Sequence, residues 1–152
     1  MRFSVIVAGA AVLLAACGGE KKTETTTDTT AAMAPAPAAA TGTRHSVDMM
    51  LDGTTYKFSP ADLTIKAGDV VVFHNVSGGP HNVQFKADSI PAGAEAVLDA
   101  ALTDKMGPLS SALVATPGDS LVISFAGAPV GDYYFTCTPH MAMNMHGKIT
   151  VE

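Results

Sequence analysis

The residue types that could bind a metal ion are concentrated near the end of the chain. Cys137, His140 and Met145 lie within nine residues, in a segment between two strand-like runs. A thiolate, an imidazole and a thioether form a soft ligand set, which suits a copper ion that cycles between Cu(I) and Cu(II). Zinc is the competing metal, but it prefers cysteine, histidine and carboxylate ligands. The segment therefore predicts a site for one copper ion.

A second imidazole is needed to complete a plane of two histidines and one cysteine around copper. His81, in the sequence Pro80-His81-Asn82, supplies it from a distant loop. A long, weak axial bond to a methionine such as Met145 is the other mark of this kind of centre. With its ligands on two loops, the site takes its geometry from the protein scaffold, so little reorganisation accompanies each electron transferred.

The elements that must position these ligands read as short β-strands, because apolar runs recur between glycine, proline and aspartate. The strands are expected at residues 46–51, 56–58, 63–65, 70–74, 81–85, 120–125, 132–136 and 147–151, and one short helix at 93–102. Strands and helices do not alternate, which disfavours a parallel α/β sheet. We therefore predict an all-β sandwich of about eight strands with one short helix over residues 44–152.

The first 17 residues read as a secretory signal, with Arg2 followed by an apolar run from residue 3 to residue 16. This run has 14 residues, fewer than the roughly 20 that a membrane-spanning helix needs. The motif Leu14-Ala15-Ala16-Cys17 resembles the lipobox of bacterial lipoprotein signals, in which the cysteine becomes the acylated N-terminus. The alternative is ordinary cleavage near Ala16, which leaves Cys17 a stray thiol.

Residues 18–43 are rich in threonine, alanine and proline and show no apolar periodicity. Such a segment buries too little surface to offset its chain entropy, so we predict a disordered tether. Cys17 and Cys137 are the two cysteines of the chain, and a disulfide between them is formally possible. If Cys17 is acylated it cannot form that disulfide, and Cys137 stays free.

The net charge is −5, and the chain has no basic block. This pattern argues against a nucleic-acid partner. A moderately negative surface favours solubility and encounter with positively charged partners.

Five segments of the domain resemble, in order, the sequence pattern of plastocyanin and its relatives pseudoazurin and amicyanin, over residues 54–152. They are Phe58-Ser59-Pro60, Ile65-Lys66-Ala67-Gly68-Asp69, Pro80-His81-Asn82-Val83, the run from Ile90 to Glu95, and the run from Cys137 to Val151. The resemblance identifies a cupredoxin domain. It implies a Greek-key β-sandwich with copper near one end, and ligand histidines that bind through Nδ1. It also implies that the side chain of Asn82 ties the two ligand loops together.

Two methionines compete for the axial position. Met143 has the amicyanin spacing from His140, whereas Met145 has the plastocyanin spacing. Choosing Met145 keeps the family register of the closing strand, while choosing Met143 requires two extra residues before that strand. We therefore predict Met145 as the axial ligand, with Met143 as the alternative.

The resemblance implies a one-electron carrier rather than an enzyme, since protein side chains fill all four ligand positions. A storage or delivery protein for periplasmic cuproenzymes is the alternative, suggested by the soft Cu(I) ligands Met141 and Met143. An enzyme such as a copper nitrite reductase would need a second copper site, for which the sequence offers no residues. We predict a periplasmic, lipid-anchored monomer whose partners are redox proteins such as c-type cytochromes or oxidases.

The edge of the His140 ring is expected to reach the surface, as it does in this family. Met141 and Met143, with Gly78 and Gly79, could form a small apolar patch around that edge. Our hypothesis is that partners dock on this patch and that His140 is the electron port; the alternative is an incidental methionine cluster. Thr136 stands where photosynthetic plastocyanins usually carry tyrosine, which argues against photosynthetic partners.

Overall fold

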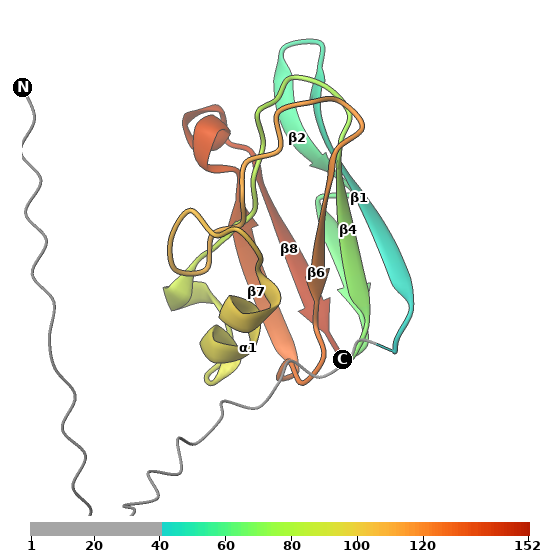
Figure 1. The fold of residues 1–152 in the computed structure, drawn as a ribbon, viewed down its shortest axis with the longest axis vertical. Helices are drawn as coiled ribbons and strands as arrows, with labels where there is room; N and C mark the ends of the chain where they lie inside the picture. Colours follow the sequence, from blue (N-terminus) through green and yellow to red (C-terminus); the bar gives the residue numbers. More distant parts are fainter. Residues whose placement is uncertain (1–40) are drawn as a thin grey trace, which may run out of the picture. The chain divides into compact units, whose positions relative to one another are not determined.

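A computed structural model describes residues 41–152 of the chain. The predicted signal, Cys17 and most of the predicted tether lie outside the described residues. Within them, eight strands form two four-stranded sheets that pack as a sandwich, with one α-helix beside them (Figure 1). The predicted all-β sandwich of about eight strands and one short helix is confirmed. No helix in residues 41–152 has the length and apolar character that a membrane crossing requires.

The first sheet has the strand order β2-β1-β4-β6. Strands β1 (Arg44–Asp52) and β2 (Thr55–Ser59) form an antiparallel hairpin. Strand β4 (Val70–Asn75) pairs with β1 in parallel and with β6 (Ser120–Ser124) in antiparallel orientation. In β1 the buried residues Val47 and Met49 lie on either side of the half-buried Asp48, because successive side chains of a strand point to opposite faces.

The second sheet has the order β3-β8-β7-β5. It contains β3 (Asp62–Ile65), β5 (Gln84–Phe85), β7 (Gly131–Thr136) and β8 (His146–Val151). Strand β5 is shorter than the strand predicted at 81–85. His81 instead exchanges two backbone hydrogen bonds with Val114, of 3.0 and 2.9 Å, and pairs with it as an isolated bridge. This part of the chain therefore pairs with a loop rather than with the sheet.

The single α-helix, α1 (Ala94–Ala101), begins after Gly93, whose φ of 82° lies in the left-handed region that glycine tolerates. Its two buried residues, Ala94 and Leu98, are four positions apart and thus share one face. A short 3₁₀ segment, η1 (Ala87–Ser89), links β5 to this helix.

The core between the sheets is built largely from aromatic rings. Phe58, Phe73 and Phe135 pack edge to face, with ring centroids 4.8, 5.5 and 6.0 Å apart, an arrangement that aromatic quadrupoles favour. The same apolar cluster includes Cys137 and Met145, and neither has exposed surface. The core therefore extends to the predicted ligands.

The turn at residues 66–69 holds both ends of the described chain. Gly42 donates a backbone hydrogen bond to Gly68 and Thr43 donates one to the carboxylate of Asp69, while Ala67 donates one to Glu152. Strand β4 leaves this turn and runs toward the loop that carries His81. The 3₁₀ segment η2 (Thr138–Met143), which contains the predicted ligand His140, lies at the opposite end of the sandwich (Figure 1).

Candidate metal centre

Three of the predicted ligands converge in the structure. The candidate donor atoms of His81, Cys137 and His140 all lie within 4.8 Å of one another. The sulfur of Cys137 is 3.6 Å from Nδ1 of His81 and 3.4 Å from Nδ1 of His140. His81 and Cys137 are fully buried, and His140 is 6% exposed. Two imidazole nitrogens and one sulfur therefore lie close together inside the protein.

The C-terminal ligand loop is closed by its own backbone. Cys137 follows directly after β7, and its N–H donates to the carbonyl of Met145 at 3.0 Å. The N–H groups of His140 and Met145 donate to Cys137 and His140 respectively. Asn144 adopts a left-handed conformation, φ 64°, which asparagine tolerates better than most residues. This turn returns the chain to β8 and places the side chain of Met145 in the core.

His81 is oriented by a residue that the sequence analysis did not identify. Nε2 of His81 lies 2.8 Å from the carbonyl of Ser77, so it carries the proton, which leaves Nδ1 free to bind a metal. The hydroxyl of Ser77 accepts a hydrogen bond from the N–H of Leu51 and donates one to its carbonyl. Ser77 thus fastens the His81 loop to β1. A single serine before two glycines carries no sequence signal for this role.

Asn82 connects the two ligand loops. Its carbonyl oxygen accepts a hydrogen bond of 2.7 Å from the N–H of Thr138, next to Cys137. Its amide nitrogen donates to the hydroxyls of Thr138 and Ser110, both at 3.2 Å. Because Asn82 is fully buried, these contacts replace the water that its amide would otherwise bind.

The three methionines after His140 differ sharply in exposure. Met145 is fully buried, whereas Met141 and Met143 are 54% and 45% exposed. The loop therefore places the thioether of Met145 in the core that also contains Cys137, and leaves the other two at the surface.

Burial shapes the charge states of the site. It raises the pKa of the Cys137 thiol, although backbone hydrogen bonds from Asn82 and His140 partly oppose this effect. It also lowers the pKa of His140, and repulsion from His81 lowers that pKa further. A bound cation would favour the thiolate form of Cys137, because a metal ion binds the deprotonated sulfur.

Comparison with protein families shows which family the chain belongs to. Residues 45–152 match the copper binding proteins of the plastocyanin/azurin family. The chain belongs to that family. Copper, predicted from the donor set, is thereby confirmed as the cofactor. Plastocyanin/azurin proteins are electron carriers and not enzymes, in agreement with the sequence-based prediction.

Individual plastocyanins share about a third of their residues with this chain. A plastocyanin of Rumex obtusifolius is 34% identical over 101 residues, which cover 66% of this chain and 93% of the relative. The chloroplastic plastocyanin of Tetradesmus obliquus is 36% identical over 121 residues, or 80% of this chain and 76% of the relative. Among solved structures, oxidised plastocyanin from Dryopteris crassirhizoma superposes with a TM-score of 0.54 at 32% identity, covering 71% of this chain and 100% of that chain.

The residues of the site fit the copper ion of the plastocyanin/azurin family. Two imidazole Nδ1 atoms and one thiol sulfur are the donor types that a blue copper site uses. No carboxylate joins the cluster formed by the described residues, which agrees with a soft ion rather than a hard one. The donor set therefore supports copper on chemical grounds as well.

Tyr56 lies against the site and was missed by the sequence analysis. Its ring stacks on the imidazole of His140, with centroids 3.8 Å apart and planes inclined by 13°. The sequence placed Tyr56 only in a strand, because nothing in its spacing from the ligands indicates this contact.

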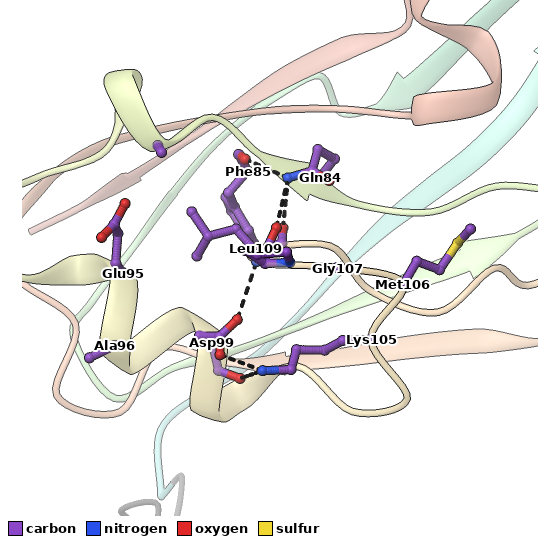
Figure 2. A pocket seen from close by; sticks show the side chains of 11 residues that line it. Gln84, Phe85, Glu95, Ala96, Asp99, Lys105, Met106, Gly107 and Leu109 are labelled. Carbon is purple, nitrogen blue, oxygen red and sulfur yellow. Dashed lines mark hydrogen bonds and ion pairs between the residues drawn. The ribbon is translucent and has the colours of Figure 1, made fainter.

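A surface pocket of about 730 Å³ lies between α1, β5 and residues 105–109 (Figure 2). Lys105 pairs with the carboxylate of Asp99, which also accepts a hydrogen bond from the N–H of Leu109. The side chain of Gln84 donates to the carbonyl of Leu109. These contacts hold the 105–109 segment against α1 and β5. None of the residues lining this pocket is a predicted ligand.

Proposed function

We propose that this protein carries single electrons between redox partners through one copper ion bound by His81, Cys137, His140 and, axially, Met145. The observation that carries the proposal is the convergence of one sulfur and two Nδ1 atoms in a buried pocket. The full burial of Met145 and the exposure of Met143 support Met145 as the axial ligand.

Bound copper supplies a one-electron couple between Cu(I) and Cu(II). The chain's own residues keep the donor groups in place before any metal arrives. Ser77 holds the ring of His81 at 2.8 Å, Asn82 joins the two ligand loops, and the Cys137 and Met145 backbones are hydrogen-bonded to each other. Ligands that are held in this way need to move little when the oxidation state changes, and this favours fast electron exchange.

His140 is the proposed electron port. It is the only one of the three converging ligands with exposed surface, and the exposed side chains of Met141 and Met143 follow it directly. An apolar patch at this position excludes water when a partner docks, and it leaves the ring edge at the contact. Partners such as c-type cytochromes or oxidases fit this proposal, together with a monomeric carrier.

We further propose that the protein works in the periplasm, anchored to a bacterial membrane through an acylated Cys17. Plastocyanin and pseudoazurin relatives also act outside the cytoplasm, and the lipobox-like motif supports the anchor. Cys17→Ser in the expressed full chain is expected to move the protein from the membrane fraction to the soluble fraction. Unchanged membrane association would refute the anchor without affecting the copper proposal.

Copper storage or delivery is the second candidate function. The two exposed thioethers of Met141 and Met143 favour it, because soft sulfur ligands attract Cu(I). A delivery protein must release its ion readily, whereas a carrier retains it through many redox cycles.

The deciding experiment is an absorption spectrum and voltammogram of the copper-loaded full chain. We expect an intense visible thiolate–copper band and reversible one-electron cycling, both lost in Cys137→Ser. A colourless protein that binds only Cu(I) and yields it quickly to a chelator would support delivery and overturn the electron carrier.

A further inference from the structure

The ring of Tyr56 lies parallel to the ring of a proposed copper ligand. Its centroid is 3.8 Å from that of His140, and the two planes are inclined by only 13°. The same tyrosine ring lies edge-on to His81, with centroids 6.4 Å apart and an interplanar angle of 64°. Tyr56 therefore contacts one ligand histidine face to face and is directed at the other.

Tyr56 also contacts the loop that carries His81. A Cβ atom added at Gly78 would lie 3.1 Å from Cε1 of Tyr56 and 2.5 Å from Cβ of Leu51. The absence of a side chain at Gly78 thus leaves room for the tyrosine ring. Since His140 belongs to the C-terminal loop and Gly78 to the earlier one, the Tyr56 ring lies close to both ligand loops.

Tyr56 itself stands on a fixed support. It belongs to β2 and is paired with Leu51 of β1 in the antiparallel hairpin. Leu51 in turn exchanges two hydrogen bonds with the hydroxyl of Ser77, at 3.1 and 3.2 Å. By contrast, His140 lies in η2 at a point where the backbone leaves helical geometry, with φ −115° and ψ 19°. A ring on paired strands therefore faces a ring on an irregular loop.

We propose that Tyr56 is a positioning residue, whose ring keeps the imidazole of His140 turned with Nδ1 toward Cys137 even when no metal is bound. In the structure this nitrogen is 3.4 Å from the cysteine sulfur. The Tyr56 ring covers one face of the imidazole and excludes the His140 rotamers that point toward solvent. Less side-chain entropy is therefore lost when copper binds.

The proposal is tested on the metal-free full chain with ¹³C-labelled histidine and two variants, Tyr56→Phe and Tyr56→Leu. Phenylalanine keeps the stacked ring, whereas leucine removes it. We expect one sharp set of His140 ring signals in the natural chain and in Tyr56→Phe, and exchange-broadened or doubled signals in Tyr56→Leu. Thermal unfolding of each variant checks that the leucine variant is folded.

A second readout uses the copper-loaded protein and rests on the proposed function. Release of Cu(I) to a chelator is expected to be about 3- to 10-fold faster in Tyr56→Leu than in Tyr56→Phe, the range that loss of an aromatic pair implies. Tyr134→Leu is the matched control, because Tyr134 is an exposed tyrosine of β7. It is expected to leave both readouts unchanged.

The outcomes separate this proposal from the proposed function. A folded Tyr56→Leu chain with the same sharp His140 signals and the same release rate as the natural chain overturns the role of Tyr56. Equal effects of the phenylalanine and leucine variants also overturn it, because the hydroxyl would then matter rather than the stacked ring. If copper fails to bind at all, the proposed function falls, while the metal-free ring signals still decide the role of Tyr56.

Discussion

The side chains around the ligands differ in how far the sequence reveals them. The positions of His81, Cys137 and His140 follow from residue type and spacing, and their donor atoms converge. The hydrogen bonds of Ser77 and the stacking of Tyr56 depend on which loops the fold brings together. A lone serine or tyrosine has no spacing rule, so such contacts are out of reach of sequence reasoning.

The first prediction concerns Asn82. Asn82→Ala removes the 2.7 Å acceptor of the partly buried N–H of Thr138 and the donor to the hydroxyl of Ser110, and each lost hydrogen bond of this kind costs about 0.5–1.5 kcal/mol of the free energy of unfolding. We expect that loss in urea unfolding of the metal-free protein, together with faster release of copper.

Gln84→Ala is the control for Asn82→Ala. Gln84 also donates from a side-chain amide, but to the carbonyls of Phe85, Pro108 and Leu109, next to the surface pocket. It is expected to leave copper release unchanged. Equal copper release from both variants would argue against a link between the ligand loops through Asn82.

The second prediction concerns stability in acid. Hydrogen bonds from Lys66, His45 and Thr43 hold the pKa of Asp69 below its usual 3.8. A carboxylate with a lowered pKa in the folded state stabilises the fold above pH about 4, and this stabilisation is lost as the pH falls through the lowered pKa. Thermal unfolding between pH about 6 and about 2 should therefore show a smaller decline in Asp69→Asn than in the natural chain. A parallel decline in both proteins would contradict this role.

Among the elements, the positions of the strands were predicted best from the sequence. The short β-type run at 132–136 predicted β7, and in the structure Tyr133 and Phe135 are buried on either side of the exposed Tyr134. The strand predicted at 81–85 was wrong at its start, because His81 pairs with Val114 in an irregular segment. Long-range pairing with a loop leaves no periodic pattern in either partner.

The third prediction concerns the contact between β8 and β7. A Cβ atom added at Gly147 would lie 2.5 Å from Cζ of Phe135 and 2.7 Å from the carbonyl of Ala61. Gly147→Ala therefore overpacks the core and should lower the free energy of unfolding by about 1–3 kcal/mol. Gly107→Ala is the control, since no atom lies within 4 Å of its added Cβ. Equal stability of the two variants would contradict the close packing at Gly147.

At the scale of the whole molecule, the proposed docking of a redox partner would depend on net charge and on the exposed methionines. The chain carries a net charge of −5. This charge attracts basic partners at long range, and added salt weakens the attraction. The apolar surface of Met141 and Met143 beside His140 acts only at contact. Encounter and docking thus depend on different residues.

The fourth prediction tests the docking patch. Met141→Lys should slow electron transfer to a c-type cytochrome several-fold without changing the copper spectrum, because a lysine must be desolvated at the contact. Met106→Lys is the matched control: it makes the same change in charge at a methionine that is 59% exposed beside the surface pocket. Stopped-flow rates measure both. Equal slowing in the two variants would assign the effect to net charge and reject the patch.

The turn at residues 66–69 has a practical consequence. It binds Gly42 and Glu152 at once, and β4 carries the chain from this turn toward the His81 loop. A solid support or a fused domain joined at either end of residues 42–152 is therefore attached on the side remote from His140. The proposed electron port at His140 is then on the far side from the support in every immobilised copy, so an electrode coated through these ends would hold a uniformly oriented layer.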